Sequence, residues 1–229
     1  MTSFDEFQPT QILNWALSTF KDLVITTGLN LSGTVLIDIA ARAGYTGEVA
    51  FVDTSYHFAE TLKLWQTLEG RYRQLKFTRL QPEFSTGPLF SSDPAACCAT
   101  NKIAPLNKFL DSRKPSAILN ARTRESAITR KSLQVIEKGN PARINPLIHL
   151  TRADLESYAK QRRLAIHPLY QQGFLSMGCW PCTRAVKRGE DSRSGRFAGQ
   201  GRTECGIWQM LKEGIGTGVE DPPENRRKP

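Results

Sequence analysis

The five cysteines of this 229-residue chain occur in three settings. Cys97 and Cys98 are adjacent, Cys179 and Cys182 form a CxxC motif, and Cys205 stands alone near the end of the chain. Four thiolates together suit structural zinc or an iron–sulfur cluster, because soft sulfur ligands select both. The pattern predicts four metal ligands and, in the lone cysteine, a nucleophile.

Each cysteine motif taken alone has other interpretations. A CxxC fits zinc, iron–sulfur and redox pairs alike, and adjacent cysteines are also found as small buried hydrophobes. The adjacent pair argues against zinc, because structural zinc sites usually separate paired ligands by about two to four residues. The combination of both pairs therefore favours a tetrathiolate metal centre, of either structural zinc or an iron–sulfur cluster.

The length and composition limit the class of protein. A chain of 229 residues can bury a core as one large α/β domain or as one domain with an appendage. Its longest apolar runs, 23–25 and 35–41, are too short to span a bilayer, and residues 1–9 carry acids where a signal peptide carries lysine or arginine. We therefore expect no membrane segment and a reducing, cytoplasmic or stroma-like compartment, which also suits an odd number of cysteines.

The net charge of +9 is unevenly distributed. Residues 1–60 carry two basic and seven acidic side chains, whereas residues 61–178 carry nineteen basic and eight acidic ones. Such an excess attracts a polyanion or a small phosphorylated ligand, although a solvated basic face is the alternative. No basic stripe with interleaved aromatic residues is present, so nucleic-acid binding is not expected.

Strand-like and helix-like patterns alternate along the chain. Strands are predicted at 22–26, 48–53, 74–80 and 116–120, and helices at 32–43, 57–68, 103–110 and 151–163. Ser32 is predicted as the N-cap of the first helix, and Thr151 with Asp154 as a capping box for the last. The alternation predicts an α/β fold with a doubly wound, mostly parallel sheet, followed by a disordered tail at 214–229.

Ligands of such sheets bind beyond the carboxyl ends of the strands, which directs attention to the loops after Thr26, Asp53 and Asn120. The first loop contains Thr26, Thr27 and Gly28, and its backbone N–H groups are suited to an anion at the start of a helix. It is neither a Walker A loop nor a GxGxxG motif, so a plain tight turn remains the alternative.

Several segments together resemble the sulfonucleotide reductases, the thioredoxin-dependent adenylylsulfate and phosphoadenylylsulfate reductases of sulfate assimilation. The resemblance covers about residues 20–210. Its motifs are Phe51-Val52-Asp53-Thr54, Cys97-Cys98 with Lys102, Asn145-Pro146-Leu147, His167-Pro168-Leu169, Gly173 to Arg184, Gly189 to Phe197, and Glu204-Cys205-Gly206.

The resemblance implies an adenine nucleotide alpha-hydrolase-like domain at 1–200 and a flexible carboxyl-terminal segment at 201–229 that carries the catalytic cysteine. Family members with both cysteine pairs hold a 4Fe-4S cluster and generally prefer adenylylsulfate (APS). The resemblance therefore implies one such cluster, with a structural or electrostatic role, on Cys97, Cys98, Cys179 and Cys182.

The chemistry of Cys205 supports the same activity. A thiolate is a strong nucleophile toward sulfur, and its attack on a sulfate–phosphate anhydride would release AMP and leave an S-sulfocysteine. An external dithiol, thioredoxin or glutaredoxin, would then release sulfite through a mixed disulfide.

Basic residues near the motifs are candidate anion ligands. Lys102, Arg193 and Arg196 fall where the family holds phosphosulfate, and Arg124 matches one arginine of the family's paired-arginine motif. Arginine offers a planar fork to paired oxygens, whereas lysine offers a point charge. His57, His149 and His167 are expected to serve packing, because a tetrathiolate site needs no histidine, and Trp180 is expected to shield the cluster.

The chain departs from the family pattern at several positions. Thr27-Gly28-Leu29-Asn30 replaces Ser-Phe-Gly, Asn101 replaces an arginine, Asn120-Ala121 replaces Thr-Gly, and Trp208 replaces the histidine after Glu-Cys-Gly-Leu. These changes keep two alternatives open: a phosphoadenylylsulfate or dual-substrate reductase, and a divergent non-reductase that binds nucleotide and an iron–sulfur cluster. The sequence leaves the oligomeric state open, a homo-oligomer included.

Overall fold

A computed structural model describes residues 8–83, 87–202 and 204–207, so the predicted tail and Trp208 lie outside the described residues. Its centre is a six-stranded sheet in the order β3-β2-β1-β4-β6-β5. All pairings in this sheet are parallel except that of β5 with β6. The predicted doubly wound, mostly parallel sheet is confirmed. The strands are β1 (Leu23–Thr27), β2 (Glu48–Val52), β3 (Lys76–Leu80), β4 (Ala117–Asn120), β5 (Ile136–Glu137) and β6 (Ala142–Ile144).

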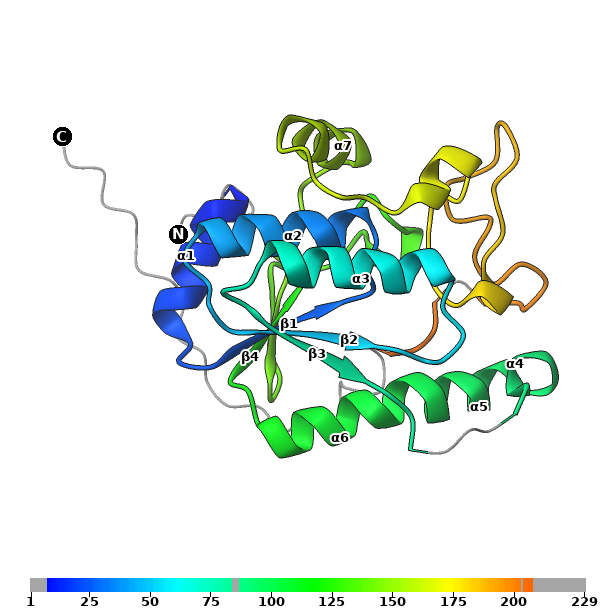
Figure 1. Ribbon diagram of the computed structural model, residues 1–229, viewed down its shortest axis with the longest axis horizontal. Helices are drawn as coiled ribbons and strands as arrows, with labels where there is room; N and C mark the ends of the chain where they lie inside the picture. The colour runs from blue at the N-terminus through cyan, green and yellow to red at the C-terminus, as the bar shows by residue number, and fades with distance from the viewer. Residues whose placement is uncertain (1–7, 84–86, 203, 208–229) are drawn as a thin grey trace.

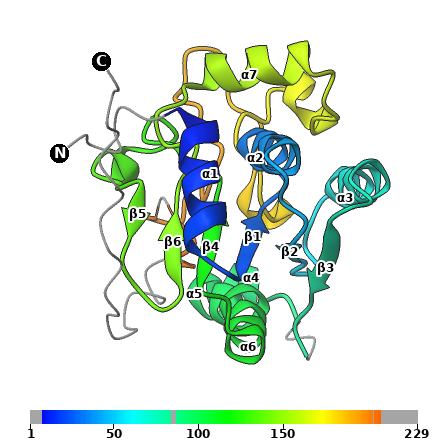
Figure 2. The same cartoon turned by 90° about the vertical axis from the view of Figure 1, so that its left-hand side faces the viewer.

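Helices cover both faces of the sheet (Figures 1 and 2). One face carries α1 (Pro9–Thr19), α2 (Leu31–Arg42) and α3 (Ala59–Arg71), with α7 (Arg152–Gln161) packed on α2. The other face carries α4 (Leu89–Ser92), α5 (Pro94–Cys98) and α6 (Ala104–Arg113). Short helical turns lie at η3 (Ile128–Arg130), η4 (Pro168–Gln172) and η5 (Trp180–Cys182). None of the described helices combines the length and the hydropathy needed to cross a membrane.

The alternation of side chains along β1 explains how the sheet is held between these layers. Leu23 and Ile25 are buried in the large apolar cluster under α1 and α2, whereas Val24 packs in the smaller cluster with Leu106 and Leu110 of α6. Successive strand residues point to opposite faces, so a strand that is buried on both sides consists almost wholly of apolar residues.

The start of α2 shapes the loop after β1. Asn30 is the N-cap, and its Oδ1 accepts a hydrogen bond from the backbone N–H of Gly33 at 2.9 Å. The predicted N-cap at Ser32 is wrong, because this residue lies in the first turn and its Oγ donates to Asn30 Oδ1 at 3.0 Å. A short amide satisfies the same orphan donors, so the helix begins earlier than expected. The capping box predicted for α7 is confirmed, with Thr151 and Asp154 as its two members.

The helix predicted at 103–110 is part of a longer helical run. Asp93 caps it by accepting from two backbone N–H groups, and the run continues through α5, a π-helical segment (Ala99–Ile103) and α6. Single π-helical turns inside α-helices are frequently found at functional sites. Here the widened turn directly follows Cys98 and contains Lys102.

Candidate functional site

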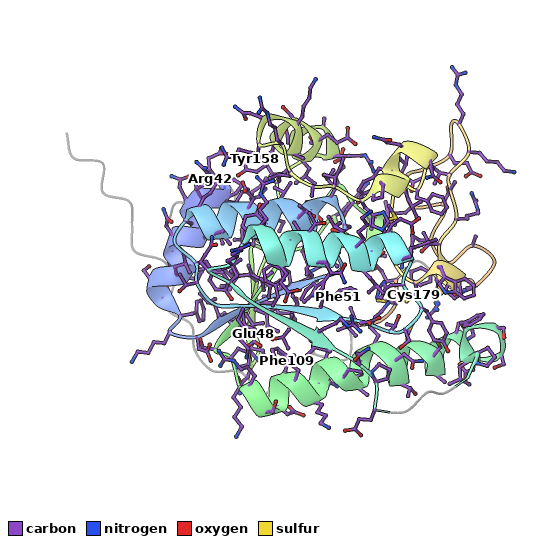
Figure 3. The ribbon with its side chains drawn as sticks, in the orientation of Figure 1. Arg42, Glu48, Phe51, Phe109, Tyr158 and Cys179 are labelled. Carbon is purple, nitrogen blue, oxygen red and sulfur yellow. The ribbon has the colours of Figure 1, made fainter. Side chains whose placement is uncertain are left out.

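The four cysteines of the two pairs line a single pocket. Cys97 and Cys98 end α5. Cys179 is the N-cap of the short turn η5 and Cys182 is its last residue. The strands β4, β5 and β6 and the helix α7 lie between the two pairs in the sequence. Figure 1 shows these distant segments side by side at one end of the molecule, and Figure 3 marks Cys179 there. The fold therefore brings together all four predicted metal ligands.

Each of the four sulfurs lies within hydrogen-bond distance of a different polar side chain. The pairs are Thr54 Oγ1 with Cys179 Sγ at 3.1 Å, Asn101 Nδ2 with Cys97 Sγ at 3.6 Å, Arg202 Nη1 with Cys98 Sγ at 3.4 Å, and Gln200 Nε2 with Cys182 Sγ at 3.7 Å. Donors around thiolates orient the ligands of a metal centre and tune its charge. The surroundings of the pocket thus suit sulfur that carries negative charge.

The arrangement separates two kinds of metal site. In the part of the chain that the structure describes, no group of three His, Cys, Asp or Glu side chains is placed to hold one metal ion. A four-iron cluster takes one thiolate on each iron, so its four ligands surround a larger object. Burial raises the pKa of Cys97, and the three neighbouring thiols raise it further, which is a cost that bound iron would relieve. Four thiols on the wall of one pocket are the donor set that such a cluster takes.

A larger cleft of about 570 Å³ opens beside the thiol pocket, at the carboxyl ends of the central strands. The order of the sheet reverses between β1 and β4. Near the ends of these strands, Thr26 Oγ1 donates a hydrogen bond of 2.9 Å to Asn120 Oδ1. Ligands of doubly wound sheets bind at such a switch point. The predicted loop residues Thr26, Thr27 and Gly28 all line the cleft, and so does Cys205.

Two cations connect the cleft with the thiol pocket. Lys102 and Arg196 line both cavities. Burial lowers the pKa of Lys102, but the charges of Cys179 and Cys205 outweigh it and raise the pKa overall. Burial also lowers the pKa of Arg196, against the opposing effect of Cys205 and Cys179. The fields of these two cations therefore act at once on the thiol of Cys205 and on the thiols of the smaller pocket.

The position of Arg196 depends on a glycine. A Cβ atom added to Gly178 would lie 2.4 Å from Nη2 of Arg196, well inside the contact distance. The guanidinium group passes over this glycine and donates to the carbonyl oxygens of Met177 and Cys182. Gly178, which directly precedes the CxxC motif, thus leaves the space that the guanidinium group of Arg196 occupies on the wall of the cleft.

Arg193 and Cys205 both line the cleft, and Glu204, the residue before Cys205, binds Arg193. Arg193 Nη2 donates to Oε2 of Glu204 at 3.1 Å, and Arg130 also binds this carboxylate. Within the predicted carboxyl-terminal segment 201–229, the structure describes 201–202 and 204–207, and Glu204, Cys205 and Ile207 line the cleft. All of the predicted site residues except Arg124 line the cleft or the thiol pocket.

Arg124 is placed elsewhere. Its Nε donates to the backbone oxygen of Leu133 at 2.9 Å, and the residue is absent from the cleft wall. Arg122, Arg130 and Arg152 line the cleft instead, and none of them was predicted. The first two follow β4 in a loop at the carboxyl edge of the sheet, so their position in the sequence carried a usable signal. Arg152 starts α7, which nothing in the pattern tied to the cleft.

His57 lies on the floor of the cleft. Its ring packs on Phe51 with 4.8 Å between ring centroids, and its Nε2 lies 3.0 Å from the backbone oxygen of Val52. Burial, reinforced by the charge of Lys102, lowers its pKa to about 4. The histidine is therefore neutral at neutral pH. Trp180 packs edge-to-face on Phe90 of α4 and remains 47% exposed.

Comparisons of sequence identify the family of the chain. Residues 22–185 match the family described as the phosphoadenosine phosphosulfate reductase domain. The adenosine 5'-phosphosulfate reductase of Deinococcus radiodurans is 52% identical over 89% of this chain and 83% of its own length. The enzyme of the same name from Bacillus cereus is 34% identical over 90% of this chain and 94% of its own length.

Solved structures agree on the fold. The phosphoadenylyl-sulfate reductase of Candida auris has a TM-score of 0.68 at 24% identity and covers 77% of this chain and 90% of its own. The FMN adenylyltransferase of Candida glabrata has a TM-score of 0.61 at 15% identity, over 81% and 69%. The predicted adenine nucleotide alpha-hydrolase-like architecture is thereby confirmed. With the family match, the curated relatives and the site geometry all in agreement, the chain belongs to the phosphoadenosine phosphosulfate reductase family.

Proposed function

We propose that this chain reduces APS to sulfite and AMP, with Cys205 as the nucleophile. The observation that carries the proposal is the presence of this thiol, Lys102 and Arg196 on the walls of one cleft at the switch point of the sheet. Relatives that resemble the chain along most of its length bear the name of this activity, those of Deinococcus radiodurans and Bacillus cereus among them. The two cations offer a place for the sulfate and phosphate oxygens beside a sulfur nucleophile.

The reaction would take place in two transfers. The thiolate of Cys205 attacks the substrate sulfur, an S–S bond forms, the bond from sulfur to the bridging phosphate oxygen breaks, and AMP leaves with its electron pair. A dithiol protein, thioredoxin or glutaredoxin, then attacks Sγ of Cys205, and sulfite leaves with the electrons of the broken S–S bond. The second thiol of the reductant resolves the mixed disulfide, so the reductant is oxidised and the cysteine is restored.

Lys102 and Arg196 would act mainly on the first transfer. Both charges face the position where the thiolate forms, and cations favour the ionised nucleophile. They would also bind the phosphate oxygens on which negative charge develops as AMP leaves. Because the two cations stabilise both the thiolate of Cys205 and the departing AMP, their removal should slow the sulfur transfer as well as weaken the binding of the substrate.

The four clustered cysteines would hold a 4Fe-4S cluster. Such a cluster would supply a fixed local charge next to Lys102, and it would join the end of α5 to the turn η5. The hydrogen bonds from Thr54, Asn101, Gln200 and Arg202 support this assignment, because they place donors where thiolate charge would be. Iron–sulfur proteins with free catalytic thiols suit a reducing compartment, and we propose a cytoplasmic location.

The 3'-phosphorylated nucleotide is the alternative substrate, since the matching domain is described by that compound. The charges of the cleft favour the unphosphorylated one. Two of the additional arginines are balanced by carboxylates, Arg122 by Glu137 and Arg152 by Glu156. A second phosphate would have to compete with these acids for cations.

The test is mass spectrometry of anaerobically purified protein mixed with APS or its 3'-phosphorylated form, without a reductant. A sulfonate adduct on Cys205 with APS is the expected result. An adduct only with the 3'-phosphorylated compound would show that this compound, and not APS, is the substrate. If neither nucleotide gives an adduct on protein whose iron is intact, the chain is a nucleotide-binding protein without reductase activity.

A further inference from the structure

Glu204, the residue directly before the proposed nucleophile, is held by two arginines. Arg130 donates to both of its carboxylate oxygens, through Nε to Oε1 and through Nη2 to Oε2, each at 3.0 Å. Arg193 donates to Oε2 at 3.1 Å, and the hydroxyl of Thr129 lies 3.3 Å from Oε1. Paired donation from a guanidinium fork fixes orientation as well as distance.

This cluster of charges is mostly shielded from water. The side chains of Arg130, Arg193 and Glu204 are 19%, 16% and 24% exposed. Burial alone would raise the pKa of Glu204, but the two arginines lower it overall, so the carboxylate is charged at neutral pH. Partly buried pairs with good geometry resist screening by salt far better than exposed pairs.

Arg130 is itself anchored to the body of the domain. It belongs to the turn η3, which follows β4, and its Nη1 donates to Oγ of Ser126 at 3.0 Å. The pair with Glu204 therefore links the loop after a central strand to the carboxyl-terminal segment. Removal of Glu204 would leave two partly buried arginines without this carboxylate, whereas removal of Arg130 would leave Glu204 with Arg193 alone.

A second contact holds the other side of the nucleophile. Ile207 packs against the apolar cluster that contains Val24, Leu106 and Ile118. Cys205 thus lies between a polar anchor one residue before it and an apolar anchor two residues after it. Two fixed points so close in the chain leave the backbone at the thiol few ways to move.

From this geometry we infer that Glu204 is a positioning residue: its carboxylate, clamped by Arg130 and Arg193, holds Cys205 against the cleft for attack on the substrate sulfur. The inference rests on the proposed function, because it assigns the purpose of the clamp to that reaction. It also gives Arg193 a structural partner in addition to its predicted role toward the substrate. A displacement of about 1 Å at a reacting centre can slow a reaction roughly 100-fold.

The clamp is tested by Glu204→Gln, Arg130→Gln and the double variant, in protein with its iron content verified. The rate of S-sulfonation of Cys205 by APS in a single turnover should fall roughly 10- to 100-fold in each single variant. The affinity for AMP, measured by calorimetry, should change less than about threefold. Because the two residues act as one unit, the double variant should be no slower than the slower single variant.

Two further measurements separate positioning from general damage. The folded protein is alkylated with iodoacetamide, and the modified peptide that contains Cys205 is quantified after digestion. The rate of alkylation should rise when the clamp is removed. This measurement needs neither cluster nor substrate. Arg130→Lys keeps the charge but loses the fork, so it should recover part of the rate. Glu83→Gln, which removes the exposed partner of Lys108, is the matched control and should leave every value unchanged.

Three results would overturn the inference. They are an unchanged sulfonation rate in Glu204→Gln, a double variant whose loss is the product of the single losses, and a marked gain in AMP affinity, which would mean that the carboxylate competes with the ligand. Failure of the proposed function has a different signature, because the unmodified protein would then form no adduct on Cys205. The two failures are therefore distinguishable.

Discussion

Thr54 Oγ1 lies 3.1 Å from Cys179 Sγ, which connects the loop after β2 to the CxxC turn. Each group is able to donate to the other as thiol and hydroxyl, but only the hydroxyl can donate once the sulfur is a metal-bound thiolate. The contact therefore suits the proposed cluster.

Thr54→Val should weaken the cluster while preserving the shape of the side chain. Loss of a hydrogen bond to a ligand typically reduces metal affinity about 10- to 100-fold. We expect faster bleaching of the visible absorbance by a chelator. Thr67→Val serves as the control, because it removes the hydroxyl of an exposed residue of α3 that donates to the backbone oxygen of Lys63. Equal bleaching rates for the two variants would remove the assigned role of Thr54.

Cys205→Ser and Cys179→Ser should have different effects. The first should abolish sulfite release and keep the absorbance of the cluster, because this thiol lines the cleft and not the thiol pocket. The second should lose both iron and absorbance. Iron analysis with a sulfite assay checks the pair, and equal loss of colour in both variants would contradict the division of roles.

Lys102→Gln should reduce kcat/KM for APS by roughly 10- to 100-fold, the usual magnitude for a hydrogen bond to a charged group. Its charge acts on Cys205 as well as on the substrate, so kcat should fall along with the rise in KM. Lys108→Gln removes an exposed lysine of α6 and should leave both kcat and KM unchanged. A change in KM alone would show that the lysine only attracts the nucleotide.

Asp38 should contribute to stability without a role in the reaction. This buried carboxylate of α2 accepts hydrogen bonds of 2.8 Å from the hydroxyls of Tyr72 and Tyr158, the latter marked in Figure 3. Asp38→Ala leaves both hydroxyls without this partner and should lower the free energy of unfolding by about 2 to 4 kcal/mol. Urea denaturation measures the loss, and Tyr158→Phe should cost less because one bond remains.

His57 should make stability depend on pH. Its pKa is about 4 in the folded protein, below its ordinary value of 6.5, so the unfolded chain binds the proton more readily. Stability from this residue is therefore complete above pH 6.5 and is lost as the pH falls toward 4. The difference in Tm between the protein and His57→Gln should narrow over this range. A constant difference would show that the histidine does not titrate on unfolding.

The sequence predicted those elements whose pattern was long or chemically distinctive. The strands β1 to β4 and the helices α2, α3, α6 and α7 were expected within a few residues, because their apolar periods are clear. Helix α1 and the short strands β5 and β6 at one side of the sheet were missed. A two-residue strand carries no period, and its pairing depends on the neighbour that the fold supplies.

The site shows the same division. Cysteines were predictable because thiols in pairs have few uses, and Lys102 and Arg196 because of their motif. Gln200 and Arg202 were not, since amide and guanidinium groups occur widely and only the fold brings them to Cys182 and Cys98. The clamp on Glu204 was likewise hidden, because its partner Arg130 lies far away in the chain.

The origin of the four clustered thiols from two distant segments has a practical consequence. Between Cys98 and Cys179 the chain contributes β4 and β6 to the sheet and adds α7. The proposed cluster would bind all four thiols only after these parts have assembled, so its colour would report completed folding during biosynthesis. Cellular iron supply would thereby limit the yield of mature protein, and iron starvation would leave folded but colourless chains.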